Sequence, residues 1–268
     1  MSVTGATLNA DDDDKKKEDG EPEAKKPRLE ETPEETTNEP ATVPEELDAL
    51  RHRMEHRDSL REKLIKKCRD GQKAAKQAIY ALHRRDFKKS AKLIQDCEDC
   101  INNELLPIVL EEPPLRGGCF GGVIEEYAEA RLFYVWLLGK DDTDTNMDAD
   151  TTAAKGTLLL PDEFAIALEP DAYLGGLCDL TGEIGRFAVQ RGTARDYDGV
   201  RQCLEANSAV LTSIQSMEKT PNGINKKMDQ LRRSVSKIER MIYEMSLSKA
   251  AGMNINSEVK EASAEGGD

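Results

Sequence analysis

The sequence predicts an all-α protein, and three observations point to this class. Apolar side chains recur at intervals of three and four residues through most of the chain between residues 44 and 247. No segment shows the alternating apolar and polar pattern of a half-buried strand. Stretches rich in glycine, proline or acidic residues separate the periodic segments, as expected for loops between helices.

Composition divides the chain into one domain and two tails. Residues 1–43 hold 13 acidic and 6 basic residues and few large apolar ones, which predicts a disordered acidic tail. Residues 44–247 form the predicted helical domain, with an acidic loop insert at 141–155. Residues 248–268 turn polar and acidic again and predict a second disordered tail.

The first half of the domain predicts three helices. A long helix at 44–85 carries apolar residues on a three-four frame, and a second helix runs from Asp86 to about 105. The segment GGCFGG at 117–122 predicts a loop, so the third helix is expected only over 123–138.

The second half also predicts three helices, at 171–190, 197–217 and 224–247. In the helix at 171–190, Gly176, Gly182 and Gly185 lower the helix propensity, which suggests that another backbone approaches closely there. The helix at 224–247 has a complete apolar stripe, which is typical of a core or a helix-partner seam.

Cysteine usage and targeting signals predict a soluble protein of the cytoplasm and nucleus. The six cysteines come without a signal peptide, and no apolar run is long enough to span a membrane, so we expect reduced thiols and no membrane partner. Basic clusters at 15–17 and 25–28 suggest nuclear import. Cys97 and Cys100 have the spacing of zinc ligands, but they lack a second pair and fit a helical core.

Four acids occupy unusual helical positions. Glu126 and Glu129 lie three residues apart on one helix, and Asp179 and Glu183 lie four apart on another. If these helices pack together, the carboxylates converge and require a cation. An all-oxygen site favours Mg²⁺, with Mn²⁺ as the alternative. Surface charges that simply face solvent are the competing interpretation.

Other chemistries lack their motifs. Iron in a helix bundle would call for Glu-x-x-His pairs, and we expect none of His52, His56 and His83 near these acids. There is no nucleophile elbow or phosphate-binding loop, which leaves hydrolysis by metal-activated water. Glu125-Glu126-x-x-Glu129 also matches half of the motif of all-α nucleotide pyrophosphohydrolases, but the second half is missing.

Four segments together resemble the translin family across about residues 50–247. They are HRRDF at 83–87, EEYAEA at 125–130, DAYLGGLCDLTGE at 171–183 and KKMDQLRRSVSKIERMIYEMSL at 226–247. The Asp and Thr of DLTGE match the translin-associated factor X branch rather than translin itself.

The resemblance implies a seven-helix bundle that joins a translin homologue in a hetero-octameric shell. It also implies a magnesium-dependent endoribonuclease of single-stranded or nicked RNA, active in passenger-strand removal during RNA silencing and in tRNA fragment processing. The family motifs place the catalytic and metal-binding acids at Glu126, Glu129 and Asp179, with Glu183 as a supporting ligand. The alternative is a non-catalytic scaffold subunit that binds RNA or DNA.

The basic first helix is the expected RNA contact. Although the net charge is −14, residues 44–92 hold 15 basic and 8 acidic residues. Such side chains would hold the backbone of single-stranded RNA, or of single-stranded DNA, without reading its sequence. A helix face that only meets solvent is the other interpretation. The candidate residues are Arg57, Arg61, Lys66, Lys67, Arg69, Lys73 and Lys76.

Overall fold

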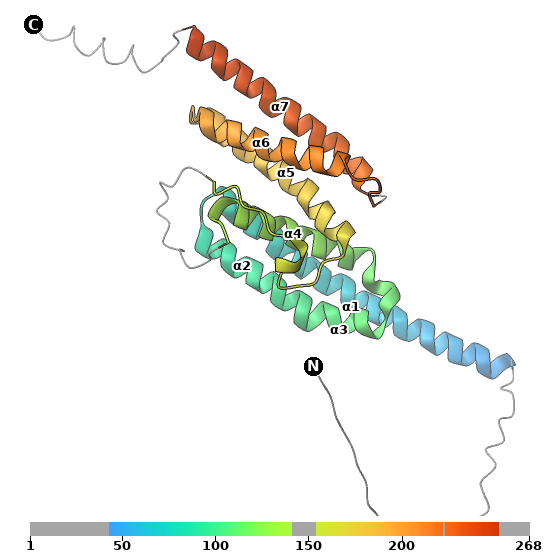
Figure 1. Cartoon of the computed structure of the whole chain (residues 1–268). Coiled ribbons are helices and arrows are strands. Elements are labelled where there is room, and N and C mark those ends of the chain that lie inside the picture. Colours follow the sequence, from blue (N-terminus) through green and yellow to red (C-terminus); the bar gives the residue numbers. More distant parts are fainter. Residues whose placement is uncertain (1–42, 141–153, 222, 252–268) are drawn as a thin grey trace, which may run out of the picture. The chain divides into compact units, whose positions relative to one another are not determined.

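The computed structural model of the chain describes residues 43–140, 154–221 and 223–251. All regular elements in these residues are helical, so the all-α prediction is confirmed (Figure 1). Three short helical segments join the main ones: η1 (Ile101–Leu105), η2 (Pro113–Arg116) and η3 (Pro161–Glu163). The α-helices are α1 (Val43–His83), α2 (Phe87–Cys100), α3 (Leu106–Glu111), α4 (Cys119–Leu138), α5 (Pro170–Thr193), α6 (Tyr197–Gln215) and α7 (Ile224–Ala250).

The chain divides into two compact units, residues 1–46 and residues 47–268. Of the first unit, the structure describes only the opening turn of α1. The basic clusters proposed for nuclear import, most of the acidic insert and most of both tails lie outside the described residues, so these assignments stay predictions. None of the described helices is long and apolar enough to cross a membrane.

The short links after α1 and after α5 have the same backbone conformation and the same type of N-cap. Arg85 after α1 and Arg195 after α5 adopt positive φ angles of 59° and 58°. Asp86 and Asp196 follow them, and each side chain accepts a hydrogen bond from the backbone N–H three residues later, at 3.2 Å and 2.9 Å. A left-handed residue followed by an aspartate N-cap ends one helix and starts the next. The HRRD segment is therefore a sharp turn between α1 and α2.

The start of α4 differs from the sequence-based expectation. The helix begins at Cys119, so most of GGCFGG forms its first turn and the prediction of a loop over this segment is wrong. Only Gly117 and Gly118 remain in the link, and Gly118 needs to be glycine because its φ is 64°. A Cβ on Gly122 would lie 3.1 Å from the Gln72 Nε2, so this glycine lets α1 approach α4.

Helices α4 and α5 pack closely because α5 lacks a side chain at the contact. A Cβ on Gly176 would lie 2.7 Å from the Ala128 Cβ and 2.9 Å from the Glu129 backbone nitrogen. The expected approach of another backbone is thus confirmed at Gly176. Gly185 instead faces α7, where a Cβ would lie 2.7 Å from the Ser234 Oγ.

Contacts between helices show that α1, α4 and α5 run in one direction. Along α1, Gly71 faces Val123 of α4, and Lys76 then meets Glu126 one turn further along both helices. Along α4 and α5, the contact at Gly176 is followed by an edge-on ring contact between Trp136 and Phe187, also further along both helices. Residues near the middle of these three helices therefore lie side by side.

All six cysteines carry free thiols. Burial raises the pKa of Cys97 to about 12 and that of Cys178 to about 11. Cys100 is half-buried, and its thiol lies 3.6 Å from the Lys67 carbonyl oxygen. The interpretation as a core residue is confirmed for Cys97, whereas Cys100 is only partly buried and packs against the core.

Candidate active site

The four predicted acids line one cavity of about 520 Å³, which we call the acidic cavity. Glu126 and Glu129 reach it from α4, while Asp179 and Glu183 reach it from α5. Their spacings of three and four residues place each pair on one helix face, and the close packing at Gly176 brings the two faces together. The structure therefore assembles the whole predicted set from residues far apart in the sequence.

The surroundings of Glu129 disfavour the charged form of its carboxyl group. Its side chain is buried, and it makes no hydrogen bond or ion pair with any other described residue. Burial raises its pKa to about 8, and the negative charges of Glu183, Asp179 and Glu126 add to the effect. Negative charge thus exceeds positive charge around this carboxyl, which is the environment that a cation would relieve.

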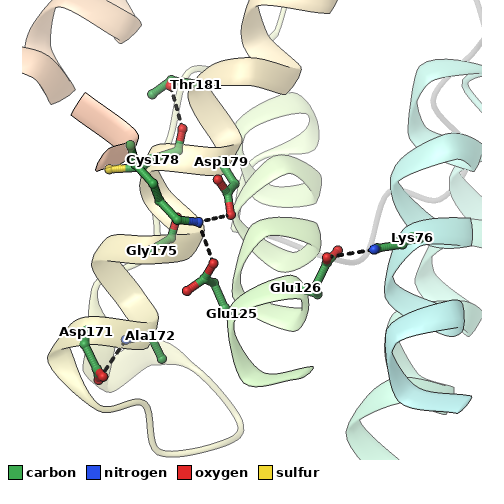
Figure 2. A network of polar contacts seen from close by, with 10 residues as sticks. Lys76, Glu125, Glu126, Asp171, Ala172, Gly175, Cys178, Asp179 and Thr181 are labelled. Carbon is green, nitrogen blue, oxygen red and sulfur yellow. Dashed lines mark hydrogen bonds and ion pairs between the residues drawn. The ribbon is translucent and has the colours of Figure 1, made fainter. Parts of the chain in front are cut away.

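Asp179 is held by a lysine that the sequence analysis did not identify. The Lys227 ammonium, from α7, contacts Asp179 and also lies 2.5 Å from the Glu125 Oε1. Figure 2 shows dashed lines from Glu125 and Asp179 to one shared nitrogen atom. Burial lowers the pKa of Lys227, but its hydrogen bonds to Asp179 and Glu125 outweigh this effect and raise it. Lys227 thus stays charged and links three helices.

Glu183 contacts two basic side chains. The His83 Nε2 lies 2.6 Å from its Oε2, and an Arg186 Nη1 lies 2.7 Å from its Oε1. The expectation that no histidine lies near the acids is therefore wrong for His83, because α1 ends beside α5. The case against a di-iron site now rests only on the missing Glu-x-x-His pairs.

The surroundings of His83 fix its orientation. Its ring packs on Phe133, with 4.9 Å between the ring centroids. The Gln190 Nε2 lies 3.5 Å from the ring Nδ1. The carboxylate of Glu183 accepts the hydrogen bond from the Nε2–H of His83.

Among the seven basic residues predicted to bind RNA, only Lys76 lines the acidic cavity. It lies 3.0 Å from Glu126 and reaches it from α1, as Figure 2 shows. Arg57 and Arg61 border a different cavity, of about 600 Å³, and Lys67 pairs with Glu104. The remaining three are exposed on α1 and form no ion pair with other described residues: Lys66, Arg69 and Lys73.

A buried amide behind the acidic cavity holds α5, α6 and α7 together. The Asn207 Nδ2 donates hydrogen bonds to the Thr181 carbonyl oxygen at 2.9 Å and to the Ser234 Oγ at 3.1 Å. The only sequence signal for this contact is an asparagine within the apolar pattern of α6. This contact fixes the backbone of the DLTGE segment, which carries Asp179 and Glu183.

The donor chemistry of the acidic cavity fits a hard divalent cation, because four carboxylates meet there and one of them lacks a partner. Among the described residues, however, no three His, Cys, Asp or Glu side chains form a group that could hold a metal ion as they stand. Three acids instead contact basic side chains: Glu126 contacts Lys76, Asp179 contacts Lys227, and Glu183 contacts His83 and Arg186.

Comparisons with known proteins agree with the motifs. A model of the translin family matches residues 59–249. The translin-associated protein X homolog of Schizosaccharomyces pombe is 26% identical over 234 residues, which cover 81% of this chain and 94% of that protein.

Solved structures show the same fold. The crystal structure of apo-NeC3PO has a TM-score of 0.62 at 16% identity, and that of AfC3PO has 0.63 at 18%. A complex of AfC3PO with duplex RNA has 0.58 at 20% identity. Each match covers 76% of this chain and nearly all of the other. Since the family model covers most of the chain, this protein belongs to the translin family.

Proposed function

We propose that this chain is the metal-dependent endoribonuclease subunit of a hetero-oligomer with a translin homologue, and that it cleaves single-stranded or nicked RNA. The observation that carries the proposal is the convergence of four carboxylates on one cavity, with Glu129 left without a partner. Two comparisons support it: the similarity to a translin-associated protein X homolog and a related fold that has been solved with duplex RNA.

The cation would be held by Glu126, Glu129, Asp179 and Glu183, with Mg²⁺ as the first choice and Mn²⁺ as the second. When bound, such an ion would polarise a phosphate and lower the pKa of water. Binding would require the acids to exchange basic partners for the cation. Glu129 has no basic partner to give up, and with its pKa raised to about 8 it would release its proton when it binds the cation.

Basic neighbours of the cavity would position the acids and the RNA. The Nε2–H of His83 holds one oxygen of Glu183, and Lys227 holds one oxygen of Asp179. These contacts from α1 and α7 orient the two carboxylates, and the second oxygen of Glu183 meets Arg186 of its own helix. Lys76 is largely exposed beside Glu126, so it is placed to meet a phosphate at the rim.

A second candidate is a non-catalytic scaffold subunit that binds RNA or DNA. The ion pairs of the acidic cavity favour it, because Lys76, His83, Arg186 and Lys227 already contact three of the four acids. In this case the acids would stabilise the helix packing and nothing more.

Cleavage and metal binding, measured on the chain assembled with a translin homologue, separate the two candidates. We expect Asp179→Asn and Glu129→Gln to slow cleavage of single-stranded RNA in Mg²⁺ by about 100-fold or more. Both variants should also weaken Mn²⁺ binding, measured by electron paramagnetic resonance without RNA. Glu205→Gln, an exposed acid on α6, is the matched control and should change neither quantity. If both cavity variants assemble, bind Mn²⁺ and cleave as wild type does, the nuclease proposal is wrong.

We extend the proposal to the cellular roles that the family resemblance implies, namely passenger-strand removal and tRNA fragment processing in the cytoplasm and nucleus. Cells that carry only the Asp179→Asn chain should accumulate nicked passenger strands and tRNA fragments. Sequencing of their small RNAs against wild-type cells measures both.

A further inference from the structure

Helix α7 carries an exposed basic face. Arg233, Lys237 and Arg240, which we call the basic face of α7, border a shallow hollow of about 350 Å³ together with Arg232 and Ser236. The other side of the helix is apolar and faces the core, with Ile224, Met228, Leu231, Val235 and Ile238 all buried. The core therefore fixes which way the basic face points.

Most of the positive charge on this face is not neutralised by neighbouring acids. Lys237 and Arg240 form no hydrogen bond or ion pair with other described residues. Arg233 donates only to the backbone carbonyl of Asp229, at 3.0 Å, while the carboxylate of Asp229 pairs with Arg232. The basic face of α7 is thus free to meet an external polyanion.

The basic face continues from the rim of the acidic cavity. Gln230 of α7 lines that cavity, and Arg233, Lys237 and Arg240 follow it three, seven and ten residues later. These offsets keep all four side chains on one side of the helix, and each turn advances by about 5.4 Å. A row of positive charge therefore leads away from the four carboxylates.

A polyanion needs such a row if part of it is to enter an acidic cavity. The cavity carboxylates repel phosphates, so the binding free energy must come from cations outside it. We propose that the basic face of α7 binds the phosphate backbone of the RNA strand whose cleaved segment lies in the acidic cavity. This inference rests on the proposed function and assigns a path to its substrate. The contacts are to phosphates, so they carry no sequence preference.

The test is binding of a fluorescent single-stranded RNA oligonucleotide to the assembled protein in EDTA, followed by anisotropy over a range of salt concentrations. In the triple variant Arg233→Gln/Lys237→Gln/Arg240→Gln we expect affinity to fall about tenfold or more, and the salt slope to shrink by roughly 2. The matched control removes three exposed lysines of α2: Lys88→Gln/Lys89→Gln/Lys92→Gln. Its affinity should stay within about twofold of wild type, because the same charge is lost from a helix that lines neither the acidic cavity nor the hollow on α7.

The outcomes are distinct. If wild type binds and the α7 triple variant binds equally well, the inference is overturned while the nuclease proposal stands. If both triple variants weaken binding equally, the effect is one of net charge and the path along α7 is wrong. If wild type binds no RNA at all, the proposed function itself fails. Size-exclusion chromatography and thermal melting of each variant show that an affinity change does not come from misassembly.

Discussion

The His83 Nε2 lies 2.6 Å from the Glu183 Oε2, so the last residue of α1 is joined to the middle of α5 across the acidic cavity. Both side chains are largely buried, at 14% and 7% exposure. A buried carboxylate that loses such a partner keeps the cost of its desolvation. The pair therefore couples the end of α1 to the DLTGE segment.

Removing either partner should show this coupling. We expect His83→Gln and Glu183→Gln to have non-additive effects on the free energy of unfolding, with a coupling energy of about 1 to 3 kcal/mol. Urea unfolding of the two single variants, the double variant and wild type in EDTA gives this energy directly. Strictly additive effects would mean that the His83 and Glu183 side chains do not stabilise each other.

Replacing Glu129 should change how stability depends on pH. Its pKa rises from 4.5 to about 8 on folding, so the folded state holds an extra proton between these values. Its contribution to stability is fully present below the lower value and is lost as pH rises through the upper one. In EDTA, wild type should therefore lose roughly 2 to 4 kcal/mol relative to Glu129→Gln between about pH 5 and pH 9. Thermal or urea unfolding across this range measures it, and Glu205→Gln should follow the wild-type curve.

Replacing Lys227 should destabilise the protein, whereas replacing its neighbour should not. Lys227→Met leaves Asp179 and Glu125 without their shared cation, and we expect a loss of about 1 to 3 kcal/mol. Lys226→Met removes the same charge from an exposed residue that forms no ion pair with other described residues, and it should change stability by less than about 0.5 kcal/mol. Equal urea midpoints for the two variants would contradict the bridging role of Lys227.

Two glycines of α5 should respond oppositely to alanine. A Cβ on Gly176 would press on the α4 backbone, so Gly176→Ala should cost about 1 to 3 kcal/mol and widen the acidic cavity. A Cβ on Gly182 would meet only the Gln230 Nε2 at 3.5 Å, so Gly182→Ala should be neutral or stabilise by up to about 1 kcal/mol through helix propensity. Thermal unfolding ranks the variants, and a tolerated Gly176→Ala would refute tight packing between α4 and α5.

The helices were predictable because their signals are local. The apolar stripe from Ile224 to Ile238 marks the buried side of α7, and the Asp86 cap marks the start of α2. The start of α4 was missed because four glycines within six residues predict a loop, while packing against α1 favours helix there. Helix propensity depends on the local sequence, whereas the helices that pack against a segment cannot be inferred from that segment alone.

The acids of the site were predictable for a different reason. Asp179 stands out because it interrupts an apolar helix, and the family motifs identify its companions. His83 and Lys227 lie within the HRRDF and KKMDQ segments, but nothing in either segment marks them as neighbours of the acids, because each is an ordinary polar residue of its own helix. Their roles arise only from the parallel packing of α1, α4 and α5 and from the position of α7 beside them.

The contact between His83 and Glu183 spans 100 residues of sequence, and that between Lys227 and Glu125 spans 102. Neither can form until long stretches of chain have closed into loops, which is costly in entropy. The turns at Asp86 and Asp196 need only neighbouring residues. We therefore expect the acidic cavity to be completed late in folding. A fully formed cavity then indicates that distant parts of the chain have already packed together.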